Sequence, residues 1–420
     1  LPAAPMPDPE PIETRLARAG LPPLERMAWL EIDLDALRGN LAALRAIVGP
    51  DTRVEPVVKA DAYGHGAVPV ALALEAAGAD GLSVATLDEG LELREAGVTL
   101  PLLVIYPIPP DAVASAAGAG IAVSLGPGRD CDRVLAAAAG LSSPLEVHLE
   151  VETGLGRGGV LPESVAGAIA VVQASPGVRL GGVWTHLAAA DDAANARGQD
   201  ERFTTALGLV DAVAWGGGPE AVRRHLAGSG GVLGAQVARW DSVRTGLAIY
   251  GLVPDALVPP PAMMEAVGRL RPVMALKARP VRVLELPAGH GVSYGPTYVT
   301  TRPTTIATLP VGYGDGWRRA LSDRADALVR GVRVPLVGRV AMDAVMADVT
   351  GVPGAPVTED DEFVLLGTQA TERITALELA SACGTISYEI VTGMSRRLAR
   401  VYHAAGPASG ARTLTGGRSK

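Results

Sequence analysis

Residues 56–66 read Pro56-Val57-Val58-Lys59-Ala60-Asp61-Ala62-Tyr63-Gly64-His65-Gly66, an apolar run that delivers one lysine into a turn punctuated by glycines. A lysine amine that reacts with a carbonyl group must be partly desolvated, so that its neutral form is accessible, and must lie where a ligand can reach it. The end of a strand meets both demands. The alternative interpretation of Lys59 is a solvated lysine that leaves a strand.

Outward from this stretch, the chain alternates between short apolar runs and helix-length segments. One of these segments opens at Thr86-Leu87-Asp88-Glu89, which has the pattern of a capping box. A short strand at residues 29–32 and a helix over residues 37–48 precede the first run. Eight strand–helix units in one stretch of sequence predict a (β/α)8 barrel, which we place at residues 28–268. The expected barrel strands lie near Val54, Leu82, Leu102, Ile121, Val147, Gly182, His225 and Val243.

The barrel prediction places several polar and glycine residues on one rim, because catalytic groups in such folds come from the carboxyl ends of the strands. Taken singly, each has a simpler explanation: a core histidine, a surface arginine in an ion pair or a serine in a turn. Their ordered coincidence favours a functional site. The residues at or just after strand ends are Lys59, Arg157, His186, Asp191, Ser229, Arg244, Gly246 and Leu247.

Beyond about residue 271 the pattern changes to short strands bounded by turns, which predicts a mainly β domain over residues 269–405. Three clusters of glycines and polar side chains stand out there, at residues 291–295, 312–317 and 338–343. Residues 1–27 are expected to form a flexible extension and residues 406–420 a flexible tail.

Length, charge and composition narrow the class of protein. A chain of 420 residues is long enough for two domains. The formal net charge of −8 argues against a nucleic-acid partner. We expect neither a membrane span nor a signal peptide, because no apolar run is long enough and residues 1–27 are acidic. Cys131 and Cys383 are expected to be reduced thiols, as in a cytoplasmic protein.

The motifs around Lys59, Arg157, His186, Arg244 and Tyr294 resemble, in order and approximate spacing, those of alanine racemases. The resemblance runs from about residue 29 to residue 402. It implies an enzyme dependent on pyridoxal 5'-phosphate that interconverts L- and D-alanine and supplies D-alanine for cell-wall synthesis. It further implies a homodimer with composite sites, in which Lys59 carries the cofactor and serves one face of the substrate, and Tyr294 of the partner subunit serves the other.

The resemblance also implies roles for the remaining residues, and it implies no metal ligand. Phosphate would be held by Tyr63, Ser229, Gly246 and Leu247, and Tyr388 would lie beside the cofactor at the substrate gate. Arg244 would face the pyridine nitrogen, with His186 stacked beside the ring. Arg157 and Met342 would contact the substrate. Supporting or gate positions would be Glu150, Asp191, Tyr313, Arg319 and Asp343.

Glu150 is a departure from the family, because many members carry a carbamylated lysine seven positions before the arginine. Strict alternation along residues 145–152 puts Glu146, His148, Glu150 and Glu152 on one face, so that Glu150 points into the barrel. A carboxylate there needs a partner, and Arg157 is the natural one. The shorter glutamate predicts a bridging water or a shifted Arg157; pairing of Glu150 only within the barrel floor is the alternative.

Two other classes of protein share parts of this pattern. A decarboxylase dependent on the same cofactor would place an acidic residue, not Arg244, against the pyridine nitrogen. A non-catalytic barrel that binds the cofactor would end near residue 260 and would lack Tyr294. Within racemases, activity on serine or on a broad range of amino acids stays open, because side-chain packing sets the size of the substrate.

Overall fold

The computed structural model describes residues 10–211, 215–216, 221–234, 237–414 and 416–419. The chain divides into two compact units, which are described one at a time. Leu37–Arg271 forms the barrel unit, and Leu1–Ala36 together with Pro272–Lys420 forms the β unit.

The barrel unit contains eight parallel strands whose order around the sheet is β2-β9-β8-β7-β6-β5-β4-β3. The two end strands are joined just beyond β2, where Val57 bridges to Ser83 and the Val58 N–H donates to the Ser83 carbonyl over 2.8 Å. The sheet is therefore closed, and the predicted (β/α)8 barrel is confirmed. The strands are β2 (Arg53–Val54), β3 (Leu82–Val84), β4 (Leu102–Val104), β5 (Ile121–Leu125), β6 (Leu145–Glu150), β7 (Val178–Trp184), β8 (Arg223–Gly228) and β9 (Ser242–Arg244).

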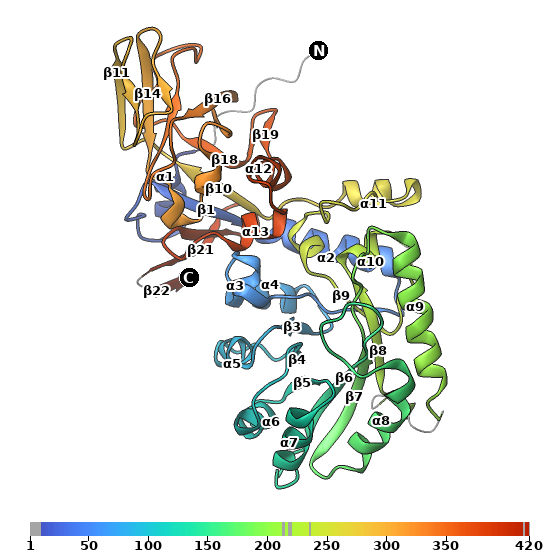
Figure 1. Ribbon diagram of the computed structural model, residues 1–420. Helices are drawn as coiled ribbons and strands as arrows, with labels where there is room; N and C mark the ends of the chain where they lie inside the picture. The colour runs from blue at the N-terminus through green and yellow to red at the C-terminus, as the bar shows by residue number, and fades with distance from the viewer. Residues whose placement is uncertain (1–9, 212–214, 217–220, 235–236, 415, 420) are drawn as a thin grey trace. The chain divides into compact units, whose positions relative to one another are not determined.

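Helices alternate with these strands and lie outside them (Figure 1). The predicted capping box is present at the start of α5, where Glu89 accepts from the Thr86 N–H over 3.2 Å. The helices are α2 (Leu34–Val48), α3 (Lys59–Tyr63), α4 (Ala67–Ala76), α5 (Leu87–Glu95), α6 (Val113–Gly118), α7 (Arg129–Ala138), α8 (Val165–Ala174), α9 (Ala193–Gly208), α10 (Ser229–Gly234) and α11 (Met264–Gly268), with 3-10 turns η1 (Pro110–Ala112), η2 (Pro162–Ser164), η5 (Leu247–Tyr250) and η6 (Pro261–Met263).

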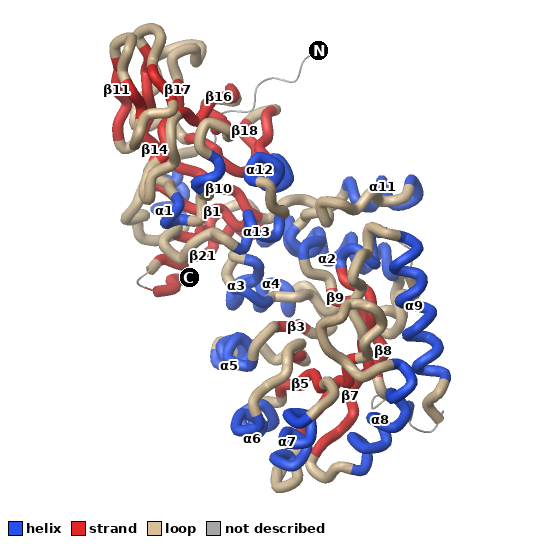
Figure 2. The backbone as a smooth tube through the Cα atoms, in the orientation of Figure 1, coloured by secondary structure: helices blue, strands red, loops and turns tan. Residues whose placement is uncertain are grey.

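The β unit is built mainly of strands, as predicted (Figure 2). Its main sheet runs β11-β14-β17-β16-β15-β18-β10-β1-β20-β21-β22, with β19 paired to β18, and β12 pairs with β13. The strands are β1 (Ala28–Asp33), β10 (Met274–Ala278), β11 (Arg282–Leu286), β12 (Gly291–Val292), β13 (Tyr298–Val299), β14 (Thr304–Leu309), β15 (Asp326–Val329), β16 (Val332–Val337), β17 (Val345–Asp348), β18 (Phe363–Gln369), β19 (Glu372–Ile374), β20 (Ala399–His403), β21 (Ala408–Thr413) and β22 (Gly416–Ser419). The unit also contains α1 (Ile12–Arg18), α12 (Ala376–Cys383), α13 (Ser387–Thr392), η7 (Tyr313–Asp315) and η8 (Arg319–Leu321).

The first regular strand lies in a different unit from the one the sequence predicts. The strand at residues 29–32 is expected ahead of the eight barrel strands but within the barrel domain, whereas β1 pairs antiparallel with β10 and parallel with β20 in the β unit. Residues 28–36 therefore belong with the second domain. The local apolar pattern of β1 shows that the strand is buried, but not which strand some 245 positions away hydrogen-bonds to it.

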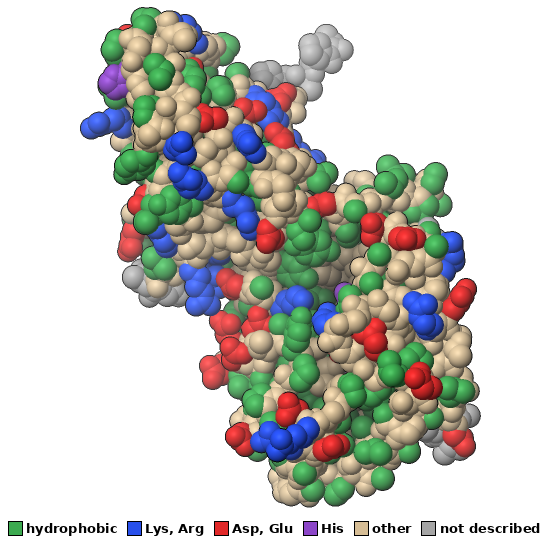
Figure 3. All heavy atoms as spheres, viewed as in Figure 1, with side chains coloured by type: hydrophobic (Ala, Val, Ile, Leu, Met, Phe, Trp, Pro, Cys, Tyr) green, Lys and Arg blue, Asp and Glu red, His purple; other side chains and the backbone are tan. Residues whose placement is uncertain are grey.

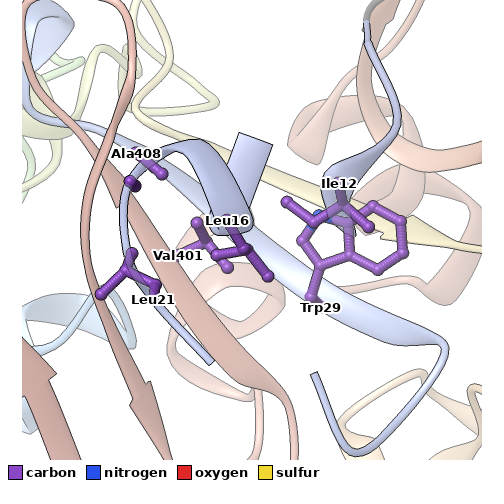
Figure 4. Packing of buried hydrophobic residues seen from close by; sticks show 7 residues of the cluster. Ile12, Leu16, Leu21, Trp29, Val401 and Ala408 are labelled. Atoms are coloured by element: carbon purple, nitrogen blue, oxygen red, sulfur yellow. The ribbon is translucent and has the colours of Figure 1, made fainter. Parts of the chain in front are cut away.

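Both ends of the described chain are more ordered than expected. Ile12 and Leu16 of α1, four positions apart on one helix face, pack on Trp29, Val401 and Ala408 (Figure 4). At the other end, β21 pairs antiparallel with β20, and β22 pairs with β21. The expected flexible extension and tail are therefore ordered in the described residues, through burial of apolar side chains at one end and strand pairing at the other. Residues 1–9 of the extension lie outside the described part of the chain.

The surface carries charges of both signs. On the face drawn in Figure 3, basic and acidic side chains are interspersed and do not form a large patch of one sign. Within the described residues, we find no helix with the length and apolar character needed to cross a membrane.

Candidate active site

Lys59 stands at the start of an unusual backbone turn on the barrel rim. The next four residues, Ala60 to Tyr63, all have φ between 52° and 55°, in the left-handed helical region. L-residues disfavour this conformation by roughly 1–2 kcal/mol each, so four in succession need strong external support. Such strain is concentrated at functional sites, where the surrounding structure enforces it.

Side chains and backbone on both sides hold this turn. The Ala62 N–H donates to the Val58 carbonyl over 2.9 Å, and Asp61 Oδ1 accepts from the Ala67 N–H over 2.8 Å. Glu89, whose Oε2 caps α5, accepts from the Ala60 N–H through Oε1 over 2.6 Å. Sequence reasoning found the capping box and missed this second role, which joins the start of α5 to the residue after Lys59.

The surroundings of Lys59 favour its neutral amine. Burial lowers the pKa of Lys59, the Arg157 cation lowers it further, Glu89 opposes the shift and Arg244 adds to it. The side chain is only partly buried, so a ligand can still reach it. A neutral, accessible amine is the form that attacks a carbonyl group.

Three segments of the rim form a small polar cradle. A Cβ atom on Gly246 would lie 2.5 Å from Tyr63 Oη, so the Tyr63 hydroxyl lies directly against this glycine. Ser229, which follows β8, accepts from the Ala248 N–H through Oγ over 3.0 Å. Leu247 is buried at the start of η5. Hydroxyl groups and backbone N–H groups around a glycine suit a phosphate group, which glycine lets approach closely.

Arg244 ends β9 and is buried. Its Nη2 donates to the Thr185 carbonyl over 2.8 Å, its Nη1 donates to His225 Nδ1, and its guanidinium lies 4.6 Å from the centre of the Trp184 ring. In the described part of the chain, no carboxylate forms an ion pair with it. Burial is the main cause that lowers the pKa of Arg244 to about 10, which leaves it protonated near neutral pH.

His186, just beyond β7, lies beside Arg244. Its Nδ1 is 3.5 Å from Arg244 Nη2. Burial, followed by the charges of Arg244, Arg157 and Lys59, lowers the pKa of His186 to about 3. His186 is therefore a neutral ring at physiological pH. His225, which contacts Arg244 more closely, was not singled out from the sequence; the available signal was a histidine on a strand otherwise made of apolar and arginine residues.

The Arg157 side chain reaches back to Glu150. Arg157 Nη2 donates to Glu150 Oε1 over 2.9 Å, so the pair forms without a bridging water. The reach is explained by the backbone, since the Val160 N–H donates to the Glu150 carbonyl over 2.8 Å and folds the intervening loop back on β6. The Arg157 guanidinium also lies over the rings of Tyr106 and Trp184, at 5.6 and 5.8 Å.

The structure therefore brings together, on the barrel rim, Lys59, Tyr63, Glu150, Arg157, His186, Ser229, Arg244, Gly246 and Leu247. Asp191 is exposed in the segment between β7 and α9.

A second group of the predicted residues lies in the β unit. Tyr294 occupies a turn whose neighbour Ser293 has φ 67° and donates from Oγ to the Arg339 carbonyl over 2.6 Å. The Tyr294 side chain is 76% exposed. The Tyr313 N–H donates to the Ala341 carbonyl over 3.0 Å, which places Tyr313 beside Met342.

The remaining residues of this group lie on neighbouring elements of the same unit. Asp343 accepts from Arg397 Nη2 over 2.5 Å. Arg319 begins η8, and Tyr388 lies on α13. These residues share one unit.

The chain matches the family model of the alanine racemase N-terminal domain over residues 32–254 and that of the alanine racemase C-terminal domain over residues 273–402. The chain belongs to the alanine racemase family. It is 41% identical to the alanine racemase of Desulfovibrio desulfuricans over 380 residues, which cover 90% of this chain and 98% of that protein. It is 43% identical to the alanine racemase of Symbiobacterium thermophilum over 379 residues, with coverage of 90% and 97%.

Solved alanine racemases share the fold. The crystal structure of the Bacillus anthracis alanine racemase with bound L-Ala-P superposes with a TM-score of 0.83 at 34% identity, covering 94% of this chain and 99% of that chain. The alanine racemase from D-cycloserine-producing Streptomyces lavendulae gives a TM-score of 0.81 at 39% identity, with coverage of 91% and 98%.

Proposed function

We propose that this protein interconverts L- and D-alanine with pyridoxal 5'-phosphate bound covalently to Lys59. The observation that carries the proposal is the position of Lys59. Burial and the Arg157 cation lower the pKa of its amine, and it lies on the same barrel rim as the cradle made by Tyr63, Ser229 and Gly246. Membership of the alanine racemase family supports the same reaction.

The lysine content of the chain sharpens this assignment. The sequence has three lysines, Lys59, Lys277 and Lys420. The amine of Lys277 is engaged in ion pairs with Glu362 at 2.7 Å and with Glu31 at 3.3 Å. Lys420 lies outside the described residues. Among the described lysines, Lys59 is therefore the one whose surroundings suit attack on an aldehyde.

The donor set fits the cofactor. The hydroxyl groups of Tyr63 and Ser229 and the backbone around Gly246 would hold the phosphate, and Arg244 would present an N–H group to the pyridine nitrogen. When bound, the cofactor supplies an electron sink that makes the α-proton of the amino acid more acidic. Because Arg244 keeps its proton, it would donate a hydrogen bond to the pyridine nitrogen without transferring the proton, which would leave the ring a weaker electron sink. This arrangement favours return of a proton to Cα.

Racemisation needs a substrate held by its carboxylate and one base for each face of Cα. Arg157, oriented by Glu150, would bind the carboxylate. Lys59, once displaced by the amino group of the substrate, would move the proton on one face. Tyr294 of the partner subunit would move it on the other, and its exposure on the β unit is consistent with a site completed by a second chain.

The supply of D-alanine for cell-wall synthesis and a cytoplasmic location are proposed on the family resemblance alone.

The test begins with a panel of L-amino acids that includes alanine and serine, analysed by chiral chromatography. Borohydride reduction followed by peptide mapping should place the cofactor on Lys59, and Lys59→Ala should lose both the visible absorption and the activity. Lys277→Met is the matched control and should keep the cofactor on Lys59. A reducible cofactor bond in Lys59→Ala would refute the assignment, and absence of D-alanine among the products would refute the reaction.

A further inference from the structure

Three buried or partly buried side chains continue from Arg244 across the interior of the barrel. Arg244 Nη1 contacts His225 Nδ1, and His225 Nε2 lies 2.8 Å from His148 Nδ1. His148 Nε2 in turn lies 3.2 Å from Glu146 Oε1. His148 and His225 are 1% and 0% exposed, so water does not compete for these ring nitrogens. None of the three residues has a part in the reaction proposed above.

The chemistry of the first member dictates the direction of every hydrogen bond. Guanidinium nitrogens only donate, so His225 Nδ1 must accept, and its proton must lie on Nε2. That proton is donated to His148 Nδ1, which must also be unprotonated. His148 therefore carries its proton on Nε2 and donates it to Glu146. If either ring were a charged imidazolium, its additional N–H group would point at the N–H group of its neighbour in this network. Both rings are therefore neutral.

The environment of Glu146 fits its place as the final acceptor. Glu146 Oε1 also accepts from Arg223 Nη2 over 2.9 Å, and Oε2 pairs with Arg179. Arg223 Nη2 also lies 3.1 Å from His148 Nε2, and Glu146 Oε1 is the acceptor that lets both groups donate.

The neighbouring strand β7 leaves space for the side chains of Glu146 and His148. A Cβ on Gly181 would lie 2.2 Å from Glu146 Oε1, and a Cβ on Gly182 would lie 2.4 Å from His148 Nδ1. Two consecutive glycines in β7 are thus explained by the space that these side chains occupy.

We propose that Glu146, His148 and His225 are positioning residues that hold the Arg244 guanidinium in one orientation through a hydrogen-bond chain with a single proton arrangement. Their role toward the pyridine nitrogen rests on the proposed function; the proton arrangement itself does not. This hydrogen-bond network gives Arg244 Nη1 a fixed, uncharged partner in His225. A substitution at Glu146 would therefore change the tautomers of His148 and His225, and through them the hydrogen bond to Arg244.

The experiment is nitrogen NMR of the holoenzyme labelled with 15N-histidine. The wild type should show His148 and His225 as neutral rings protonated at Nε2, and a scalar coupling across the bond between the two rings assigns both. Glu146→Met removes the acceptor, so Arg223 should donate to His148 Nε2 and both rings should change to the Nδ1–H tautomer. Because Arg244 cannot accept from His225 Nδ1–H, the contact between Arg244 Nη1 and His225 should then be lost. Glu146→Gln keeps an acceptor oxygen and should retain the wild-type tautomers.

Kinetics then test the positioning role. Glu146→Met should lower kcat by roughly 10- to 100-fold with little change in KM, and Glu146→Gln should restore most of it. An Nδ1–H tautomer in the wild type, or an unchanged His225 in a folded Glu146→Met protein, would overturn the proton chain. An unchanged kcat in a Glu146→Met enzyme whose tautomers have switched would overturn the positioning role. The NMR results do not depend on racemisation, so failure of the proposed function is seen separately in the Lys59 test.

Discussion

Arg157 donates directly to Glu150 across 2.9 Å, at the position where many alanine racemases carry a carbamylated lysine. The loop between them folds back on β6, and this brings the guanidinium to a side chain shorter than the carbamate. The carboxylate that Arg157 contacts is thus part of the Glu150 side chain itself, and we expect no requirement for dissolved carbon dioxide.

The first prediction follows from this pair. Activity should not change when bicarbonate is rigorously removed. Glu150→Gln keeps an acceptor and loses the charge, so kcat/KM should fall about tenfold. Glu163→Gln, on the exposed turn η2, serves as the matched control and should behave as wild type. Activity that declines without bicarbonate and returns when it is restored would contradict the prediction, as would unaltered kinetics of Glu150→Gln.

The second prediction concerns the pKa of Lys59. The Arg157 cation lowers this pKa, so Arg157→Met should raise it, and the neutral amine should appear only at higher pH. The pH profile for covalent uptake of pyridoxal phosphate by the apoenzyme, followed by visible absorption, should shift upward. Arg133→Met removes an exposed arginine of α7 and should leave the profile in place. If the pH profile of Arg157→Met is unchanged or moves to lower pH, then Arg157 does not lower the pKa of the Lys59 amine.

The third prediction tests the cradle. In Gly246→Ala the new methyl group would lie 2.5 Å from Tyr63 Oη, so the Tyr63 hydroxyl must move. Affinity for the cofactor should weaken by at least about tenfold, from loss of a hydrogen bond to a charged group. Gly167→Ala, on α8 with no atom near the added Cβ, should keep wild-type affinity. Equal affinity of both variants, measured by titration of the apoenzyme, would remove Tyr63 and Gly246 from the phosphate site.

The fourth prediction tests the composite site. Lys59→Ala and Tyr294→Phe should each be inactive, and a mixture with randomised subunits should recover up to about a quarter of the wild-type activity, because half of the dimers contain one intact site. Mass spectrometry of intact dimers confirms the exchange of subunits. If exchange is complete and no activity returns, Lys59 and Tyr294 do not act across a dimer interface.

The fifth prediction concerns the N-terminal helix and the stability of the β unit. Burial alone would raise the pKa of Glu31, but Lys277 and Arg15 of α1 lower it from 4.5 to about 2. A carboxyl group with a lowered pKa in the folded state stabilises the fold above pH 4.5, and this contribution is lost as the pH falls toward 2. Glu31→Gln should therefore cost about 3 kcal/mol at pH 7 and progressively less below pH 4.5.

Denaturant unfolding at pH 7 and pH 3.5 measures this difference. Glu285→Gln, at an exposed position on β11, is the control, and its free energy of unfolding should vary with pH as that of the wild type does. A Glu31→Gln penalty that is equal at both pH values would show that the charge of Glu31 does not stabilise the fold.

Local sequence patterns were enough to predict the barrel and most of the residues on its rim. The eight strand positions and the residues that follow them were predicted correctly, because each strand–helix unit is specified by local apolar patterns, caps and glycines. In a closed parallel barrel all carboxyl ends of the strands share one rim. Order along the chain therefore sufficed to group Lys59, Arg157, His186 and Arg244.

The tertiary structure alone decided what depends on partners distant in sequence. Three contacts join segments that are distant in sequence: the pairing of β1 with β10 and β20, the packing of α1 on Trp29, and the contact between Arg244 and His225. The local sequence of each segment does not indicate which other segment it contacts. The left-handed turn after Lys59 is a further case, since Ala60, Asp61 and Ala62 have no intrinsic preference for positive φ. Only the surrounding hydrogen bonds, among them that of Glu89, make such a conformation the lowest in free energy.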